Sequence, residues 1–318
     1  MRKFINIFMS LALLVVSIFT FSACEKKASQ VKIDLPETIN LTEDKSMPKL
    51  KVYDTAVKGI VEMELEDYLL GVVAGEMYNS WHIEALKAQA ILARTYTLYY
   101  LQNFKSKYEG ADISNDVTEA QAYDASRIND SVRQAVKETE GLVILSGGEL
   151  IESWFHANSG GVTTTAKNGL NYLGEENYTQ IKKSVETAET TENFEWSKTF
   201  TKSEVMSALR EMGISVSSIA SFTISEKDDS GRVKKFKVGT SEVDANTFRI
   251  KLGSTEMKST LITDIIVSSN SINFSGRGYG HGVGMSQWGA KVLAEDGKSA
   301  EDIVKFFFKD IELAKYSF

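Results

Sequence analysis

Apolar side chains recur mainly at helical spacing along this chain, most clearly over residues 65–77. There they fall on one face of a helix with 3.6 residues per turn. They are Leu65, Tyr68, Leu69, Val72, Val73 and Met77. A short connection, 78–82, leads to a second, longer predicted helix over 83–104. The same spacing predicts helices over 129–139, 203–212, 244–252, 285–296 and 300–307.

Shorter stretches with alternating or β-branched residues predict strands. They are 49–53, 58–63, 142–145, 150–155, 219–225, 233–238, 265–267 and 271–275. The tetrapeptide at 146–149 (SGGE) is typical of a hairpin turn. Residues 166–200 are polar and weakly patterned, which indicates a loop insertion. Helices and strands occur in groups without strict alternation, so we expect an α+β fold, a helical core packed with antiparallel strands.

The N-terminus has the layout of a secretory signal over residues 1–24. A basic start is followed by an apolar run over 4–21, then by Ser22, Ala23 and the only cysteine, Cys24. This order is that of a bacterial lipoprotein, so we expect lipidation of Cys24 and a position on the outer face of the cytoplasmic membrane. The alternative is a single N-terminal transmembrane anchor, because the apolar run is close to the length that spans a bilayer.

The next segment, 25–48, is polar and contains both prolines of the chain, which favours a flexible tether. A single domain is expected over 49–318. Its composition, 42% hydrophobic and 25% charged, is that of a globular protein. The net charge of −7 offers no basic excess for phosphates, so nucleic acid is excluded as the main partner.

Glu76 breaks the apolar pattern of its helix, because position 76 continues the face formed by 69, 72 and 73. Burial and the negative end of the helix dipole both favour the neutral carboxyl group. Such a group can protonate a glycosidic oxygen. The alternative is an outward-facing Glu76 at a frayed helix end, or one paired with Arg94 or Lys87.

Three further segments carry polar side chains of possible use in binding. Residues 276–284 place glycine at every second position, and Arg277, His281, Ser286, Gln287 and Trp288 lie in or just after this run. Glycine at this density permits close backbone approach, and the side chains suit hydrogen bonding and stacking on sugars. The second segment, 155–161, carries His156 and Ser159 before two glycines. The third, 116–123, carries Gln121 and Tyr123.

Taken in order, these segments resemble the stage II sporulation protein D (SpoIID) family of cell-wall proteins. The resemblance spans roughly residues 50–318. It rests on six ordered motifs: 66–77 (EDYLLGVVAGEM), 84–96 (EALKAQAILARTY), 121–123 (QAY), 139–141 (TEG), 155–161 (FHANSGG) and 276–290 (GRGYGHGVGMSQWGA).

The resemblance implies a lytic transglycosylase that cleaves peptide-stripped peptidoglycan strands at the MurNAc–GlcNAc bond and leaves 1,6-anhydroMurNAc ends. Glu76 matches the proposed catalytic residue of the family. The expected substrate-binding residues are Arg94, Gln121, Tyr123, His156, Ser159, Arg277, His281, Ser286, Gln287 and Trp288. Some relatives carry cysteine at the position of Ser159 and are associated with zinc. This chain lacks that cysteine, so we expect no metal and no cofactor.

The family also implies a role in engulfment during sporulation, beside a partner amidase and engulfment membrane proteins. Two other functions stay open. One is a non-catalytic wall-binding protein that stimulates a partner amidase. The other is a muramidase that uses water in place of the C6 hydroxyl of the sugar.

Overall fold

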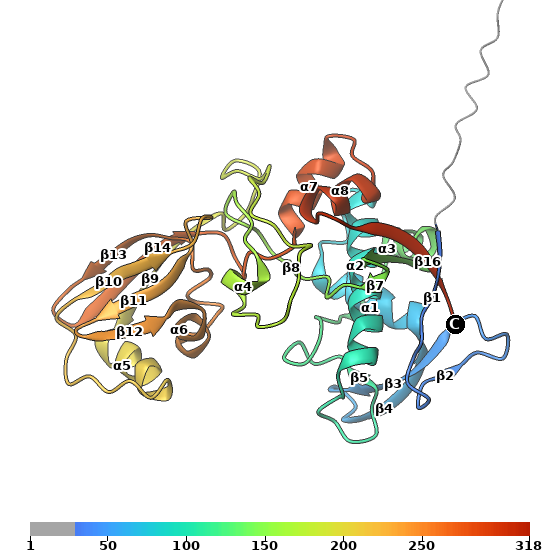
Figure 1. Ribbon diagram of the computed structural model, residues 1–318, viewed down its shortest axis with the longest axis horizontal. Coiled ribbons are helices and arrows are strands. Elements are labelled where there is room, and N and C mark those ends of the chain that lie inside the picture. The colour runs from blue at the N-terminus through green and yellow to red at the C-terminus, as the bar shows by residue number, and fades with distance from the viewer. Residues whose placement is uncertain (1–28) are drawn as a thin grey trace, which may run out of the picture.

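A computed structural model describes residues 29–318, which form two lobes joined by extended segments (Figure 1). Helix and strand are about equally represented in this range, so the predicted α+β class is confirmed. The predicted signal segment and Cys24 lie outside the described residues. No helix within 29–318 is both long enough and apolar enough to span a membrane.

The first lobe, residues 29–194 and 278–318, contains the helical core. Helix α2 runs through it and contacts four other helices. The helices are α1 (Leu65–Glu76), α2 (Ile83–Asn103), α3 (Asp130–Glu138), α7 (Gln287–Glu295) and α8 (Ala300–Phe307). Small alanine side chains on α2 are buried on several sides, which allows the neighbouring helices to pack closely.

Two small sheets flank these helices in the first lobe. The first has the order β1-β16-β6-β7, formed by Ser29–Lys32, Glu312–Ser317, Leu142–Ser146 and Glu149–Leu150. The second contains β2 (Asn40–Leu41), β3 (Pro48–Asp54), β4 (Gly59–Glu64) and β5 (Ile113–Ser114). The predicted tether therefore differs from the structure, because β1 and β2 lie within 25–48 and pair with β16 and β3.

The second lobe, residues 195–277, consists of two three-stranded antiparallel sheets and two helices. Its elements are β9 (Glu195–Thr201), α5 (Lys202–Glu211), β10 (Phe222–Lys227), β11 (Val233–Val238), β12 (Ser241–Asp244), α6 (Ala245–Leu252), β13 (Ile262–Val267) and β14 (Ser271–Arg277). Four rings, Phe222, Phe236, Phe248 and Phe274, pack with centroids 5.1–6.2 Å apart. The range 49–318 thus divides between two hydrophobic cores, where the sequence predicts one domain.

The chain leaves the first lobe after Phe194 and re-enters it at Gly278, whose N–H donates to the carbonyl of Phe194. Strand β8 (Phe155–His156) pairs in parallel with β15 (Met285–Ser286), so the turn at 156–161 lies beside the glycine run. The predicted insertion 166–200 contains the short helix α4 (Ala166–Gly169) and most of β9. The second lobe is therefore inserted between two segments that meet in space.

Candidate active site

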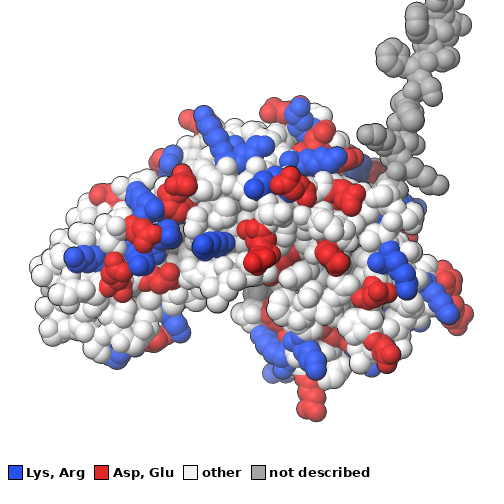
Figure 2. Space-filling view, viewed as in Figure 1, with Lys and Arg blue, Asp and Glu red and all other residues white. Residues whose placement is uncertain are grey.

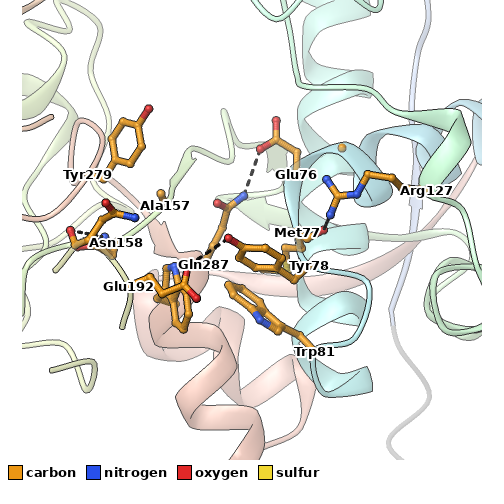
Figure 3. A pocket seen from close by; sticks show the side chains of 13 residues that line it. Glu76, Met77, Tyr78, Trp81, Arg127, Ala157, Asn158, Glu192, Tyr279 and Gln287 are labelled. Atoms are coloured by element: carbon orange, nitrogen blue, oxygen red, sulfur yellow. Dashed lines mark hydrogen bonds between the residues drawn. The ribbon is translucent and has the colours of Figure 1, made fainter. Parts of the chain in front are cut away.

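A cavity of about 290 Å³ opens at the C-terminal end of α1 (Figure 3). Five parts of the chain line it: 75–78 with Trp81, Arg127, residues 157–158, residues 192–193, and Tyr279 with 287–288. A volume of this size matches the lower end of small-ligand pockets. The lining combines polar groups with aromatic faces, which is the chemistry expected of a site for one or two sugar units.

Glu76, the last residue of α1, is half-buried in this cavity. Its Oε1 accepts a 2.7 Å hydrogen bond from the backbone N–H of Ala122, and its Oε2 accepts a 3.2 Å bond from Gln287 Nε2. Burial raises the pKa of Glu76 from its ordinary 4.5 to about 7, and the two hydrogen bonds limit the rise because they favour the anion. At neutral pH a large share of Glu76 is therefore protonated and able to donate.

Two glycines on α1 allow the loop at 121–123 to reach Glu76. A Cβ on Gly75 would lie 2.7 Å from the backbone nitrogen of Tyr123, and one on Gly71 would overlap the ring of Tyr123. The two glycines are four residues apart and so lie on the same side of the helix. Because neither has a side chain, the loop packs directly on α1 and brings the N–H of Ala122 to the carboxylate.

An aromatic wall of Tyr78, Trp81 and Trp288 borders the cavity. The ring centroids of Trp81 lie 5.3 Å from Tyr78 and 4.8 Å from Trp288. Tyr78 also donates a 3.3 Å hydrogen bond to Glu192. Flat apolar faces beside hydrogen-bonding groups suit the faces and edges of sugar rings.

The turn at 156–161 and the glycine run meet directly. Asn158 and Tyr279 exchange backbone hydrogen bonds of 3.1 and 2.8 Å, and both residues line the cavity. The two histidines lie behind them. His156 Nδ1 donates to the carbonyl of Val283, and the N–H of Val283 donates to His281 Nδ1. Burial lowers the pKa of both imidazoles, that of His156 to about 3, so both are neutral.

The histidines therefore hold the glycine run in place and do not face the cavity. The resemblance implies that they bind substrate, but neither lines the cavity, and Ala122 and Gln287 are the groups that bind the Glu76 carboxylate. The glycines of this run also allow neighbouring groups to pack closely against it. Gly282 has φ +82°, and a Cβ there would lie 2.3 Å from the guanidinium of Arg232, which reaches over from the second lobe.

A second buried carboxylate, Glu186, joins the turn at 156–161 to the start of α7 through hydrogen bonds. Its Oε1 accepts from the N–H of Ser159 (2.9 Å), from Ser159 Oγ (2.5 Å) and from Ser286 Oγ (2.7 Å). Its Oε2 accepts from Ser184 Oγ. Ser286 also caps the N-terminus of α7 by accepting from Gly289. Glu186 thereby fixes the start of the helix that presents Gln287 and Trp288.

Comparison with known proteins supports the resemblance. Residues 53–145 match the family described as stage II sporulation protein, and 156–284 match a domain of unknown function (DUF8618). An uncharacterized protein of Brachyspira hyodysenteriae is 30% identical over 270 residues, covering 83% of this chain and 70% of that protein. Stage II sporulation protein D of Bacillus subtilis is 27% identical over 289 residues, covering 84% and 79%. This chain belongs to the stage II sporulation protein D family.

A third relative bears on function. The amidase enhancer of Bacillus subtilis is 30% identical over 294 residues, which cover 78% of this chain and 40% of the enhancer. Stage II sporulation protein D relatives and an amidase enhancer are thus similar in sequence to most of this chain, and the family places the chain among sporulation cell-wall proteins.

Within this family framework, the structure brings only part of the predicted set to the cavity. Glu76, Gln287 and Trp288 line it, while Ser159, Ser286 and the two histidines support its walls. The tyrosine of the 121–123 loop packs on α1, with its ring 5.8 Å from that of Tyr68.

Three predicted binding residues lie elsewhere. Arg94 is fully buried and forms a bidentate pair with Glu66 at 2.6 Å, so it cannot reach a glycan and does not pair with Glu76. Gln121 is buried and donates to Thr97. Arg277 lines a separate hollow beside Trp196. In this structure Arg94 joins α2 to α1, and Gln121 joins its loop to α2.

Residues 156–161 do not fit a zinc site. A structural zinc needs four nitrogen or sulfur ligands, and the hydroxyl of Ser159 is already bonded to Glu186. His281 Nδ1 accepts from the N–H of Val283, so its Nε2 carries the proton and cannot bind a metal. His156 Nδ1 donates to a carbonyl and leaves its Nε2 without a partner in the described residues, but one imidazole does not make a zinc site. Within residues 29–318 no three side chains of the metal-binding types are grouped to hold an ion.

No binding role is predicted from the sequence for seven polar or aromatic residues that line the cavity: Tyr78, Trp81, Arg127, Asn158, Glu192, Asn193 and Tyr279. Tyr78 and Trp81 lie in the predicted connection just after Glu76, so the sequence alone indicates that they are near it. Glu192 lies in the segment predicted as an insertion, and only long-range folding brings it to α1. Glu186 lies in the same segment and carried no local signal at all.

Proposed function

We propose that this protein is a lytic transglycosylase that cleaves MurNAc–GlcNAc bonds in peptide-stripped glycan strands. One observation carries the proposal: a carboxyl group with a pKa of about 7 lies in a sugar-sized cavity beside an aromatic wall. On the face shown in Figure 2, acidic and basic side chains are interspersed over both lobes. Such a mixed surface suits a strand with one lactyl carboxylate per disaccharide better than it suits a densely charged polyanion such as nucleic acid.

The chemistry needs one acid that later acts as a base. Glu76 donates its proton to the bridging oxygen, and the bond from C1 of MurNAc to that oxygen breaks, releasing GlcNAc with a C4 hydroxyl. The oxocarbenium-like centre at C1 is then attacked by the C6 hydroxyl of the same MurNAc. The hydroxyl proton passes to the Glu76 carboxylate, which restores the acid and leaves a 1,6-anhydro end. No water is consumed.

The groups around Glu76 suit both halves of this cycle. Burial favours the acid before bond cleavage, while the N–H of Ala122 and the amide of Gln287 stabilise the carboxylate that forms afterwards. The opposing influences hold the pKa near neutrality, where proton donation and proton uptake are both possible.

A muramidase would need a second carboxylate to activate water, and Glu192 lines the same cavity. Its Oε2 accepts from Tyr78, and the residue is exposed. We assign Glu192 to the aromatic wall, where it fixes the ring of Tyr78.

A second candidate function comes from the similarity to the amidase enhancer of Bacillus subtilis. In that case the protein binds the wall through the same aromatic cavity and stimulates a partner amidase without cutting the strand. We also propose that it acts in engulfment, held by a lipid on Cys24 and working with a cell-wall amidase and engulfment membrane proteins.

Digestion of purified peptide-free glycan strands, followed by mass spectrometry, separates these functions. We expect products with 1,6-anhydroMurNAc ends from the wild type. Glu76→Gln should reduce cleavage by about 1,000-fold, because the amide cannot donate a proton to the leaving oxygen. Its strand binding should stay near that of the wild type.

Other outcomes would redirect the assignment. Reducing MurNAc ends would identify a muramidase. Intact strands that are nevertheless bound, together with faster cleavage by an added amidase, would identify an enhancer. Wild-type turnover by Glu76→Gln would remove Glu76 from the mechanism.

A further inference from the structure

Arg127 places a positive charge in the cavity that contains Glu76. Within residues 29–318 no carboxylate lies within ion-pair distance of its guanidinium. Its only side-chain hydrogen bond in that range, 3.0 Å from Nη2 to the carbonyl of Met77, ties it to the residue after Glu76. Figure 3 shows the Arg127 guanidinium directed toward this end of α1. The charge therefore lies at the end of α1 that carries Glu76 and lines the same cavity, without an ion-pair partner in the described residues.

The backbone beneath Arg127 is also fixed. Arg127 ends a single helical turn, Ala125–Arg127, that is capped by the side chain of Asp124. The carbonyl of Arg127 accepts a hydrogen bond from Asn79, which belongs to the connection after α1. Arg127 is thus held at its carbonyl and at Nη2, and the remaining N–H groups of its forked guanidinium have no partner within residues 29–318. A fork held in this way is suited to a planar carboxylate, because little side-chain freedom is lost on binding.

The other charged groups of the cavity do not satisfy this cation. Neither Glu76 nor Glu192 lies within ion-pair distance of the Arg127 guanidinium in the described residues, and Glu192 is bonded to Tyr78 on the aromatic wall. A ligand that brings its own carboxylate would complete the pairing. In a glycan strand that group exists in one place: the lactyl ether on C3 of MurNAc, whose carboxylate is free only after the stem peptide has been removed.

We propose that Arg127 binds the free lactyl carboxylate of the MurNAc unit whose C1 bond is cleaved, and so makes the site specific for peptide-stripped strands. This inference rests on the proposed function. C3 is two ring atoms from C1, so one sugar can present its bridging oxygen to Glu76 and its lactyl group to Arg127. A stem peptide turns the carboxylate into an amide, which removes the charge and adds bulk at the guanidinium.

A double-change cycle, in which protein variants are compared with two forms of the ligand, tests this assignment. Binding is measured by calorimetry with the full chain carrying Glu76→Gln, so that no strand is cleaved. The probes are peptide-free GlcNAc–MurNAc oligosaccharides and the same oligosaccharides with their lactyl carboxylates converted to methylamides. Each is titrated into proteins with Arg127, Arg127→Gln or Arg127→Lys. Arg133→Gln, an exposed arginine on α3 outside the cavity, controls for the loss of one positive charge.

We expect Arg127→Gln to weaken binding of the carboxylate strands by about 10- to 100-fold and to leave binding of the amidated strands unchanged. Arg127→Lys should retain part of the preference, because it keeps the charge but loses the fork. Arg133→Gln should change neither affinity. The proposal is overturned if Arg127→Gln weakens both ligands equally or weakens neither.

Failure of this inference can be told apart from failure of the proposed function. The cycle reports only on binding, whereas the products of Glu76-containing protein report on cleavage. If the protein forms anhydro ends but Arg127→Gln does not change the preference for carboxylate over amidated strands, the transglycosylase assignment stands and the carboxylate subsite is rejected. If binding of carboxylate strands depends on Arg127 but no strand is cleaved, the subsite stands and the function as an amidase enhancer is favoured.

Discussion

The two lobes differ in what they contribute to the site. The residues that line the cavity all belong to the first lobe, whereas the second lobe buries a phenylalanine cluster and opens no part of that cavity. The second lobe instead inserts Arg232, whose Nη2 donates to the carbonyls of Ser159 (2.7 Å) and Val162 (3.2 Å). Asp228, on the same hairpin, accepts from Thr164. One lobe lines the cavity, and the other fixes the turns that border it.

Ser159 is the point where the two lobes meet. Its N–H and hydroxyl donate to Glu186 of the first lobe, and its carbonyl accepts from Arg232 of the second. Both charged side chains are buried, so the turn between them is held by charge-assisted hydrogen bonds in a region that excludes water. If this interpretation is right, disturbing the second lobe should affect cleavage without touching any cavity residue.

Arg232→Met should give the largest effect of any change in the second lobe. The substitution keeps most of the buried volume but leaves two carbonyls without a donor and Glu186 without its nearby cation. We expect kcat/KM on peptide-free strands to fall by about 10- to 100-fold and the free energy of unfolding to fall by about 3 kcal/mol. Steady-state kinetics and urea denaturation measure the two quantities.

The matched control is Arg210→Met, which removes an exposed arginine from α5 of the same lobe. It should change neither quantity appreciably. Wild-type cleavage by folded Arg232→Met would show that the second lobe does not position the site, and the contrast between the lobes would have to be given up.

Glu76→Gln should change how stability depends on pH. Glu76 has a pKa of about 7 in the folded protein and an ordinary value of 4.5, so between these values the unfolded chain releases a proton that the folded chain keeps. Wild-type stability therefore decreases as pH rises from 4.5 to 7. The full loss, reached above pH 7, is about 3 kcal/mol.

The glutamine variant lacks this titration. The variant should therefore gain about 3 kcal/mol of stability relative to the wild type between pH 4 and pH 8, as measured by urea denaturation at both pH values. An identical difference at the two pH values would mean that Glu76 has an ordinary pKa. A general acid would then be a poor interpretation of this residue.

Glu192→Gln should have the smallest effect. A transglycosylase needs no second carboxylate, and glutamine can still accept the hydrogen bond from Tyr78, so cleavage should stay within about threefold of the wild type. Product analysis of the variant should still give anhydro ends. A loss comparable to that of Glu76→Gln would instead assign Glu192 as the base of a muramidase.

The sequence was most informative where the signal was local. Glu76 stood out because a carboxylate continued the apolar face of one helix, and the structure places it in a cavity with a raised pKa. The hairpin β3–β4 and the helices α1 and α2 were likewise predicted from neighbouring residues. The motifs predict that Arg94 and Gln121 bind substrate, but a motif does not distinguish a residue that packs from one that binds, and both are buried. Only the fold reveals that Arg94 pairs with Glu66.

Long-range features could not be predicted in the same way. Strands β1 and β16 come from opposite ends of the described chain and become strands by pairing with each other and with β6. Glu186 is one of several acidic residues in a polar stretch, and its role depends on serines that lie 27 and 100 positions away. Side chains with such partners carry no periodic pattern, so they appear only once the fold is known.

Direct titration of Glu76 tests the central claim, that its surroundings keep this carboxyl group neutral near pH 7. In protein labelled with ¹³C at the glutamate carboxyl carbons, the NMR spectrum is followed between pH 3 and 9 for the wild type and for Glu76→Gln. We expect one wild-type resonance to titrate with a pKa of about 7 and to be absent from the variant. If every glutamate of the wild type titrates below about pH 5.5, within the normal range for exposed glutamates, the proposed acid does not exist.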